Sequence, residues 1–186
     1  MSWAVLILAV AVVAWLIYVF NSLITLRTRA DNAWADIDVQ LKRRHDLVPN
    51  LVEVVKGYAI HERGTFEKVA TARAAAMQAA TTDQRGQTET DLVAGLRSVF
   101  ALAEAYPQLK ANEEFLDLQK NLARIEDTLQ SARRYYNAVV RDLSIKMQTF
   151  PNNLVAPLFG VTPRDYFQLE NREEANAVNV KFGDTA

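Results

Sequence analysis

The feature that most constrains the fold is an uncharged run at the start of the chain. No side chain from Trp3 to Phe20 is charged, and the first charged side chain is that of Arg27. In a helix rising about 1.5 Å per residue, this run is about 27 Å long, close to the ~30 Å hydrocarbon core of a bilayer. Trp3 and Tyr18 lie near its ends, where amphipathic rings favour the headgroup region. We therefore predict a transmembrane anchor over residues 1–26 that contacts lipid through residues 3–20.

Two other interpretations of this run are a cleaved signal peptide and a buried core helix. A signal peptide has a basic N-terminal region and small residues at its cleavage site. Here Met1 and Ser2 are uncharged, and Phe20 and Asn21 make a poor cleavage site. Core helices are rarely apolar on every face over such a length. The sequence favours a retained anchor.

The basic residues that follow the anchor predict its orientation. Arg27 and Arg29 come just after the apolar run, whereas the N-terminal side has only its α-amino group. Lys and Arg near a span favour the cytoplasmic side, so we expect a single-pass protein of the cell (inner) membrane with its N-terminus outside and its bundle in the cytoplasm. A domain of about 160 residues can also be translocated regardless of charge, which leaves the opposite orientation open.

The composition excludes several functional classes. The chain has 21 basic and 22 acidic residues, so its formal net charge of −1 gives no global electrostatic case for nucleic-acid binding. Cysteine is absent, which excludes disulfides, zinc–thiolate sites and cysteine nucleophiles. Six glycines and five prolines are few, as is typical of long uninterrupted elements. We predict an all-α protein.

After the anchor, apolar residues recur every three or four positions, which predicts long amphipathic helices. The first is expected to continue from the anchor to about residue 80, kinked at Pro49, because proline has no N–H and crowds the carbonyl of His45. Residues 81–88 are polar and predict a loop or a frayed helix end, followed by a second helix over residues 89–105. A third helix, capped by Asn112, is predicted to run to Phe150 with a coiled-coil-like seam. Residues 27–150 are therefore expected to form an antiparallel up-and-down helical bundle.

Residues 151–186 are predicted to form a short helix and a tail, the tail beginning near Glu170. Apolar side chains crowd the start of this region, and we interpret them as an oligomer or partner contact: Phe150, Leu154, Leu158, Phe159, Tyr166 and Phe167. If the helices run up, down and up, this segment lies far from the bilayer. If the third helix returns toward the membrane, the segment can instead touch lipid headgroups.

Three sequence blocks resemble the LemA family of bacterial membrane-anchored proteins. They are Gln40–Tyr58, Tyr106–Gln119 and Ala132–Asn137, the last running on to Phe150 and Pro151. The resemblance covers roughly residues 20–182, and around Asp142 to Ser144 the family more often has Tyr-Asn. It implies a single N-terminal span, an antiparallel helical bundle and a cytoplasmic body. It implies no agreed reaction.

One polar cluster is the only candidate for an active site. It comprises Arg43, Arg44, His45, Asp46, Pro49 and Asn50. A histidine that titrates near neutrality and arginines that bind phosphate would suit acid–base or phosphate chemistry. We favour a structural polar network around the Pro49 kink, because no nucleophile with a positioned base and no glycine-rich phosphate loop is evident. Neither histidine has a glutamate three residues before it, so we expect no carboxylate-bridged metal, and no cofactor.

These observations lead to three functional hypotheses. The first predicted helix extends about 50 residues past the membrane and the second is under 20 residues long, so part of the apolar stripe has no partner, which favours self-association. The leading hypothesis is a self-associating, membrane-anchored scaffold, a homo-oligomer with a structural or membrane-organising role and no active site. The second is an accessory or regulatory subunit of a membrane enzyme or transporter. The third is an enzyme centred on His45.

Overall fold

The computed structural model describes residues 2–167, and within them every regular element is helical. The elements are α1 (Ser2–Lys56), α2 (Arg63–Gln78), α3 (Thr82–Ala103), α4 (Pro107–Lys110), α5 (Glu113–Gln148), α6 (Asn152–Val155) and the 3₁₀ turn η1 (Pro157–Phe159). This confirms the all-α prediction. The tail predicted from Glu170 lies outside the described residues.

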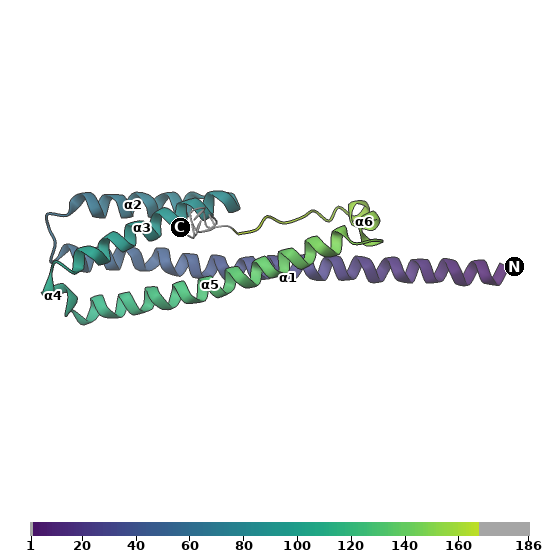
Figure 1. Cartoon of the computed structure of the whole chain (residues 1–186), viewed down its shortest axis with the longest axis horizontal. Coiled ribbons are helices and arrows are strands. Elements are labelled where there is room, and N and C mark those ends of the chain that lie inside the picture. Colours follow the sequence, from purple (N-terminus) through teal and green to yellow (C-terminus); the bar gives the residue numbers. More distant parts are fainter. Residues whose placement is uncertain (1, 168–186) are drawn as a thin grey trace, which may run out of the picture.

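The fold is organised along α1 (Figure 1). α5 returns beside α1 in the opposite direction, and α2 and α3 form a hairpin along the half of α1 that is farther from the N-terminus. Four helices of alternating direction therefore form a head at that end. Nearer the N-terminus, α1 and α5 alone form a two-helix stalk, and α6 lies beside α1 at its end. The antiparallel up-and-down bundle is confirmed.

The first helix is shorter than predicted. It ends at Lys56, not near residue 80, and the chain reverses over residues 57–62 before α2 begins at Arg63. Gly57 has low helix propensity, and the reversal still buries Phe66 and Val69 with the end of α1, so the same apolar spacing serves two antiparallel helices. α2 and α3 thus cover the apolar stripe that was expected to lack a partner.

The loop predicted over residues 81–88 is also wrong. α3 begins at Thr82, and Thr81 is its N-cap in a capping box. The Thr81 hydroxyl accepts from the Gln84 N–H at 3.2 Å, and the Gln84 side-chain oxygen accepts from the Thr81 N–H at 3.4 Å. This arrangement satisfies two backbone donors at the helix start and outweighs the polar composition of the segment. The Asn112 cap of the third predicted helix is confirmed, since its side chain accepts from the Phe115 N–H at 2.9 Å.

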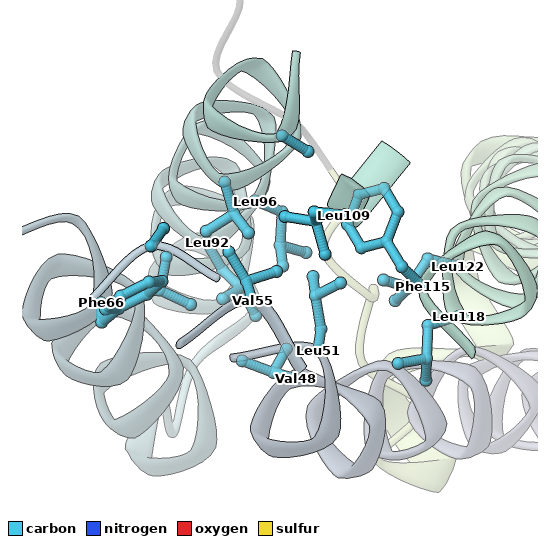
Figure 2. Close-up of a cluster of buried hydrophobic side chains, with 14 of the residues drawn as sticks. Val48, Leu51, Val55, Phe66, Leu92, Leu96, Leu109, Phe115, Leu118 and Leu122 are labelled. Carbon is cyan, nitrogen blue, oxygen red and sulfur yellow. The ribbon is translucent and has the colours of Figure 1, made fainter. Parts of the chain in front are cut away.

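Three apolar clusters follow one another along α1. In the head, α1 packs on α3, α4 and α5 (Figure 2) through Val48, Leu51, Val55, Leu92, Leu96, Leu109, Phe115, Leu118 and Leu122. A second cluster, nearer the N-terminus, packs α1 on α5 through Ala30, Ile37, Leu41, Leu129, Tyr136 and Val140. At the stalk's end a third cluster joins α1, α5 and the segment from α6 to just past η1: Val19, Leu23, Leu143, Val155, Ala156 and Val161. Each level is closed by residues of different helices, so the bundle is held along its whole length.

The first part of α1 remains outside this core. It is the one described helix long and apolar enough to cross a membrane, and only 6 % of its most apolar 18-residue window is buried in the structure. Trp3 is 80 % exposed and Val5 67 %. A core helix would be covered by its neighbours, so the structure does not support the core-helix interpretation.

Candidate functional site

A buried ionic cluster links three helices in the head. Arg44 and His45 lie on α1 and Glu89 lies on α3. Arg44 Nη1 donates to Glu89 Oε2 at 2.9 Å, and His45 Nε2 lies 2.7 Å from Glu89 Oε1. Arg44 is 2 % exposed, Glu89 1 % and His45 8 %. One carboxylate thus holds two neighbouring side chains of α1, with each of its oxygens bonded to a different partner.

The helical repeat explains why these polar side chains face inward. Arg44 and His45 follow Leu41 by three and four residues and precede Val48 by four and three, so they occupy the buried face of α1. Glu89 precedes Leu92 by three residues on the buried face of α3. Ionised groups this deep require partners, and each is placed opposite one.

α5 completes the cluster with a second carboxylate and a second guanidinium. Glu126 Oε2 accepts from Arg44 Nη2, and Glu126 Oε1 lies 3.9 Å from Arg133 Nη1. The two arginines and two glutamates balance in charge. Burial, and then the cation of Arg44, lower the pKa of Arg133 from its ordinary value, while the Glu126 and Glu89 carboxylates oppose this shift.

Arg133 is held more by packing than by hydrogen bonds. Its guanidinium carbon lies 4.8 Å from the centre of the Phe167 ring, and within residues 2–167 its Nε and Nη2 atoms have no hydrogen-bond partner. Asn137 fixes the backbone of Phe167, donating to its carbonyl at 3.0 Å and accepting from its N–H at 2.9 Å. The aromatic ring therefore covers the α5 side of the cluster.

Pro49 leaves the carbonyl of His45 without its helical donor, and a side chain of another helix replaces that donor. Arg73 of α2 donates from Nε to the His45 carbonyl at 2.7 Å. α1 continues as one helix to Lys56. The freed carbonyl is thus satisfied by a side chain 28 residues further along the chain.

We expect Arg73→Ala to lower the free energy of unfolding by about 1.5–3 kcal/mol, because it removes a hydrogen bond from a charged donor to a partly buried carbonyl. Thermal unfolding of the full chain in detergent, followed by far-ultraviolet circular dichroism, measures this change. Arg97→Ala, at an exposed position of α3, is the matched control and should shift the midpoint little. Equal shifts for the two variants would show that the Arg73 bond carries no such energy.

The structure brings together only part of the predicted polar cluster. Arg44 and His45 are buried, whereas Arg43, Asp46, Pro49 and Asn50 are exposed on the other faces of α1. Glu89, Glu126 and Arg133 were not predicted as members of this cluster. The periodicity of α3 could have indicated Glu89, because it extends the Leu92–Leu96 face by one turn. The structure buries Arg133 as well.

The residues predicted as an oligomer or partner contact are also partly exposed and partly buried. Phe150, Leu154, Leu158, Phe159 and Tyr166 are exposed, whereas Phe167 is 3 % exposed and packs on Trp34 and Arg133 of its own chain. Because α5 returns along α1, the segment after it lies beside the N-terminal part of α1. The Phe159 and Phe20 ring centres are 4.8 Å apart. Of the two arrangements left open by the sequence, the structure shows the one in which the last long helix returns toward the anchor.

The strongest donors and acceptors of the cluster face one another across α1, α3 and α5. A groove borders the cluster, lined by Asp38, Lys42, His45, Asp46, Arg85 and Glu89 with three apolar residues. The edge of the His45 ring contributes to this groove, which is the one observation that favours chemistry here.

Fold and site together define a helical-bundle protein whose N-terminal helix is able to span a membrane. A sequence model of the LemA family matches residues 33–182, and the chain belongs to the LemA family. It is 22 % identical to magnetosome protein MamQ 2 of Paramagnetospirillum magneticum over 86 % of this chain and 68 % of that protein. It is 22 % identical to magnetosome protein MamQ of Magnetospirillum gryphiswaldense over 85 % and 68 %. It is 26 % identical to protein LemA of Metamycoplasma hominis over 73 % and 63 %.

Proposed function

We propose that this protein is a membrane-anchored, self-associating helical scaffold with a structural or membrane-organising role and no active site. The observation that carries this proposal is the ionic cluster of Arg44, His45, Glu89 and Glu126. Its charges neutralise one another and fasten α1 to α3 and α5. Such a cluster specifies which helices pair and in which register, which is the best-attested use of buried ionic groups.

The anchor determines where this head acts. We propose that residues 3–20 cross the cell (inner) membrane once, with the N-terminus outside and the bundle in the cytoplasm. Arg27 and Arg29 follow the apolar run on the bundle side, in agreement with the bias of basic residues toward the cytoplasm. The unbroken helix α1 then connects the bilayer directly to the head, so that the head's position follows the anchor.

Self-association is proposed for the outer surfaces. The head's own side chains fill its interior. Its outer surface exposes four large apolar residues: Val39, Ile60, Met77 and Tyr135. Anchors that share one bilayer hold the heads at a high effective concentration, at which weak lateral contacts suffice for assembly. Similarity to proteins named for the magnetosome supports a part in a larger structure.

Purification of the full chain in mild detergent tests this function. We expect a particle much larger than one 20.9 kDa chain that contains this protein alone. A foreign membrane protein in fixed stoichiometry would support the accessory-subunit hypothesis instead, and a lone monomer would contradict both. Light scattering coupled to size-exclusion chromatography, with mass spectrometry of the subunits, distinguishes the three outcomes.

His45→Gln tests the enzyme hypothesis in the same preparation. Glutamine can still bond Glu89 but cannot exchange a proton near neutral pH. If the protein is a scaffold, the variant should form particles of the same size as the unchanged protein and should replace it in the cell. Loss of a cellular role with particle size and unfolding temperature unchanged would favour an active site at His45. The groove beside the His45 ring makes this test worthwhile.

A further inference from the structure

The segment that follows α5 presents a dense group of exposed apolar side chains. We call residues 150–161, which include α6 and η1, the apolar knob. Four of its large side chains are exposed to solvent: Phe150 (75 %), Leu154 (61 %), Leu158 (79 %) and Phe159 (46 %). Exposed apolar groups gathered this closely mark an interaction surface.

The other side of the knob is fixed to the end of the anchor. Val155, Ala156 and Val161 pack with Leu143 against Val19 and Leu23, which are 2 % and 0 % exposed. Figure 1 shows α6 beside α1, between the N-terminus and the α2–α3 hairpin. The knob therefore does not hang free of the molecule, and its height along α1 is set by a buried contact.

That height coincides with the end of the apolar run. Phe20 is the last residue of the run from Trp3, and the centre of its ring lies 4.8 Å from that of Phe159. If the run crosses the bilayer, Phe159 lies at the depth where the run leaves it. The knob's neighbours Leu154 and Leu158 must lie close to the same depth.

The distribution of charge around the knob is that of a membrane boundary. Residues 147–163 carry no charged side chain, and the cations Lys146 and Arg164 flank them, Arg164 being paired with Asp31 of α1 at 2.5 Å. On α1, Arg29 comes two turns or so after the knob contact, and it lines a groove together with Lys146, Tyr18 and Asn21. Cations just beyond an apolar surface suit lipid phosphates, and aromatic rings suit the same region.

Backbone hydrogen bonds within the knob satisfy several of its N–H groups without water. Several of its N–H groups donate within the segment: Leu154 to Pro151 at 3.2 Å, Ala156 to Asn152 at 2.8 Å, Gly160 to Pro157 at 3.2 Å and Val161 to Ala156 at 3.1 Å. Pro151 and Pro157 have no N–H to satisfy. These bonds reduce the free-energy cost of removing irregular backbone from water near lipid. Irregular backbone is compatible with the interfacial layer of the bilayer but not with its hydrocarbon centre.

We propose that the apolar knob is a second membrane contact, which inserts Phe150, Leu154, Leu158 and Phe159 into the interfacial layer of the bilayer on the side of the bundle. The span then fixes one end of the stalk through α1, and the knob fixes the same end through α5. Two contacts prevent the head from rotating freely about the anchor, because α1 and α5 are packed together. The occupant of this surface is lipid, to which the adjoining surface of the anchor is also exposed.

Depth-dependent quenching on the full chain tests this proposal. The protein has no cysteine, so Leu158→Cys gives one labelling site, and its high exposure makes the change harmless to the core. The labelled protein is reconstituted into vesicles of phosphatidylcholine with a minor fraction of phosphatidylglycerol. An environment-sensitive nitrobenzoxadiazole probe then reports polarity, and lipids spin-labelled near the headgroup or deep in the acyl chain report contact.

Two further variants calibrate the measurement. Val10→Cys lies in the run itself and is 61 % exposed, and Ile60→Cys lies at the far end of the head and is 67 % exposed. We expect the Leu158 probe to have blue-shifted emission and to be quenched at least about twofold more strongly than the Ile60 probe by the shallow label, in keeping with an interfacial depth. The Val10 probe should respond more to the deep label.

Two outcomes would overturn the proposal. Water-like emission at Leu158 with no lipid quenching would show that the knob stays in solvent. Blue-shifted emission without lipid quenching would show that protein, such as a second copy of the chain, covers it. Because the Val10 probe reports on the span separately, failure of the knob contact is distinguishable from failure of the anchor. Leu154→Cys provides an independent second position.

Discussion

Replacing Glu89 with alanine will lower the free energy of unfolding by about 3–5 kcal/mol, the cost of removing one partner from a buried ion pair. Glu89 is 1 % exposed and is bonded to both Arg44 and His45. Its loss leaves the Arg44 guanidinium, itself 2 % exposed, with only Glu126 as a carboxylate partner. For a chain of this size the unfolding midpoint should fall by roughly 6–20 °C.

Two control variants separate charge from shape. Glu89→Gln keeps an oxygen acceptor at the same position and should cost less than Glu89→Ala, though the Arg44 charge is then only partly compensated. Glu104→Ala removes a carboxylate that pairs with Lys110 on the surface, where both side chains are mostly exposed. That change should cost at most about 1 kcal/mol. Equal midpoints for Glu89→Ala and Glu104→Ala would contradict a structural role of the buried cluster.

Leu51→Ala should have the second largest effect, a loss of about 2–5 kcal/mol. Leu51 is fully buried in the head, in the cluster that joins α1 to α3, α4 and α5 (Figure 2). Truncation removes buried methyl groups and leaves a cavity that three packed helices cannot readily fill. Circular-dichroism melts of the full chain in detergent measure the change.

Ile60→Ala is the matched control for this variant. Ile60 also lies at the far end of the head, but it is 67 % exposed, so its truncation should change stability by less than about 0.5 kcal/mol. If Leu51→Ala were as stable as Ile60→Ala, the head would not be packed around α1 as described.

The parts of the fold that were predictable from sequence have strong local signals. α5 has one regular apolar seam, a capping Asn112 and a proline after its end, and the structure shows each of them. The N-terminal run is apolar on every face, so its exposure follows directly. Where α1 gives way to α2, the only local signal is Gly57. A straight helix and a helical hairpin bury the same residues with the same spacing, so only tertiary packing distinguishes them.

The candidate site was predictable only on one helix. Arg44 and His45 were predicted as members of a polar cluster on α1, but their partners are far away in sequence. On α5, steps of three and four from Leu129 to Tyr136 can pass through Ala132 or Arg133. The structure buries Arg133, since there it meets Glu126 and Phe167. Periodicity alone does not choose between two such positions, because the helical repeat of 3.6 residues fits both.

The most direct test of the central claim uses the same two single-cysteine variants, Val10→Cys and Ile60→Cys, in sealed membrane vesicles. A maleimide that does not cross membranes should modify Ile60→Cys in inside-out vesicles only, because the proposed orientation places the head in the cytoplasm. It should leave Val10→Cys unmodified in vesicles of either orientation until the membrane is dissolved and the chain unfolded. Modification of Val10→Cys in sealed vesicles at the rate of Ile60→Cys would show that this stretch of α1 lies in water and not in lipid.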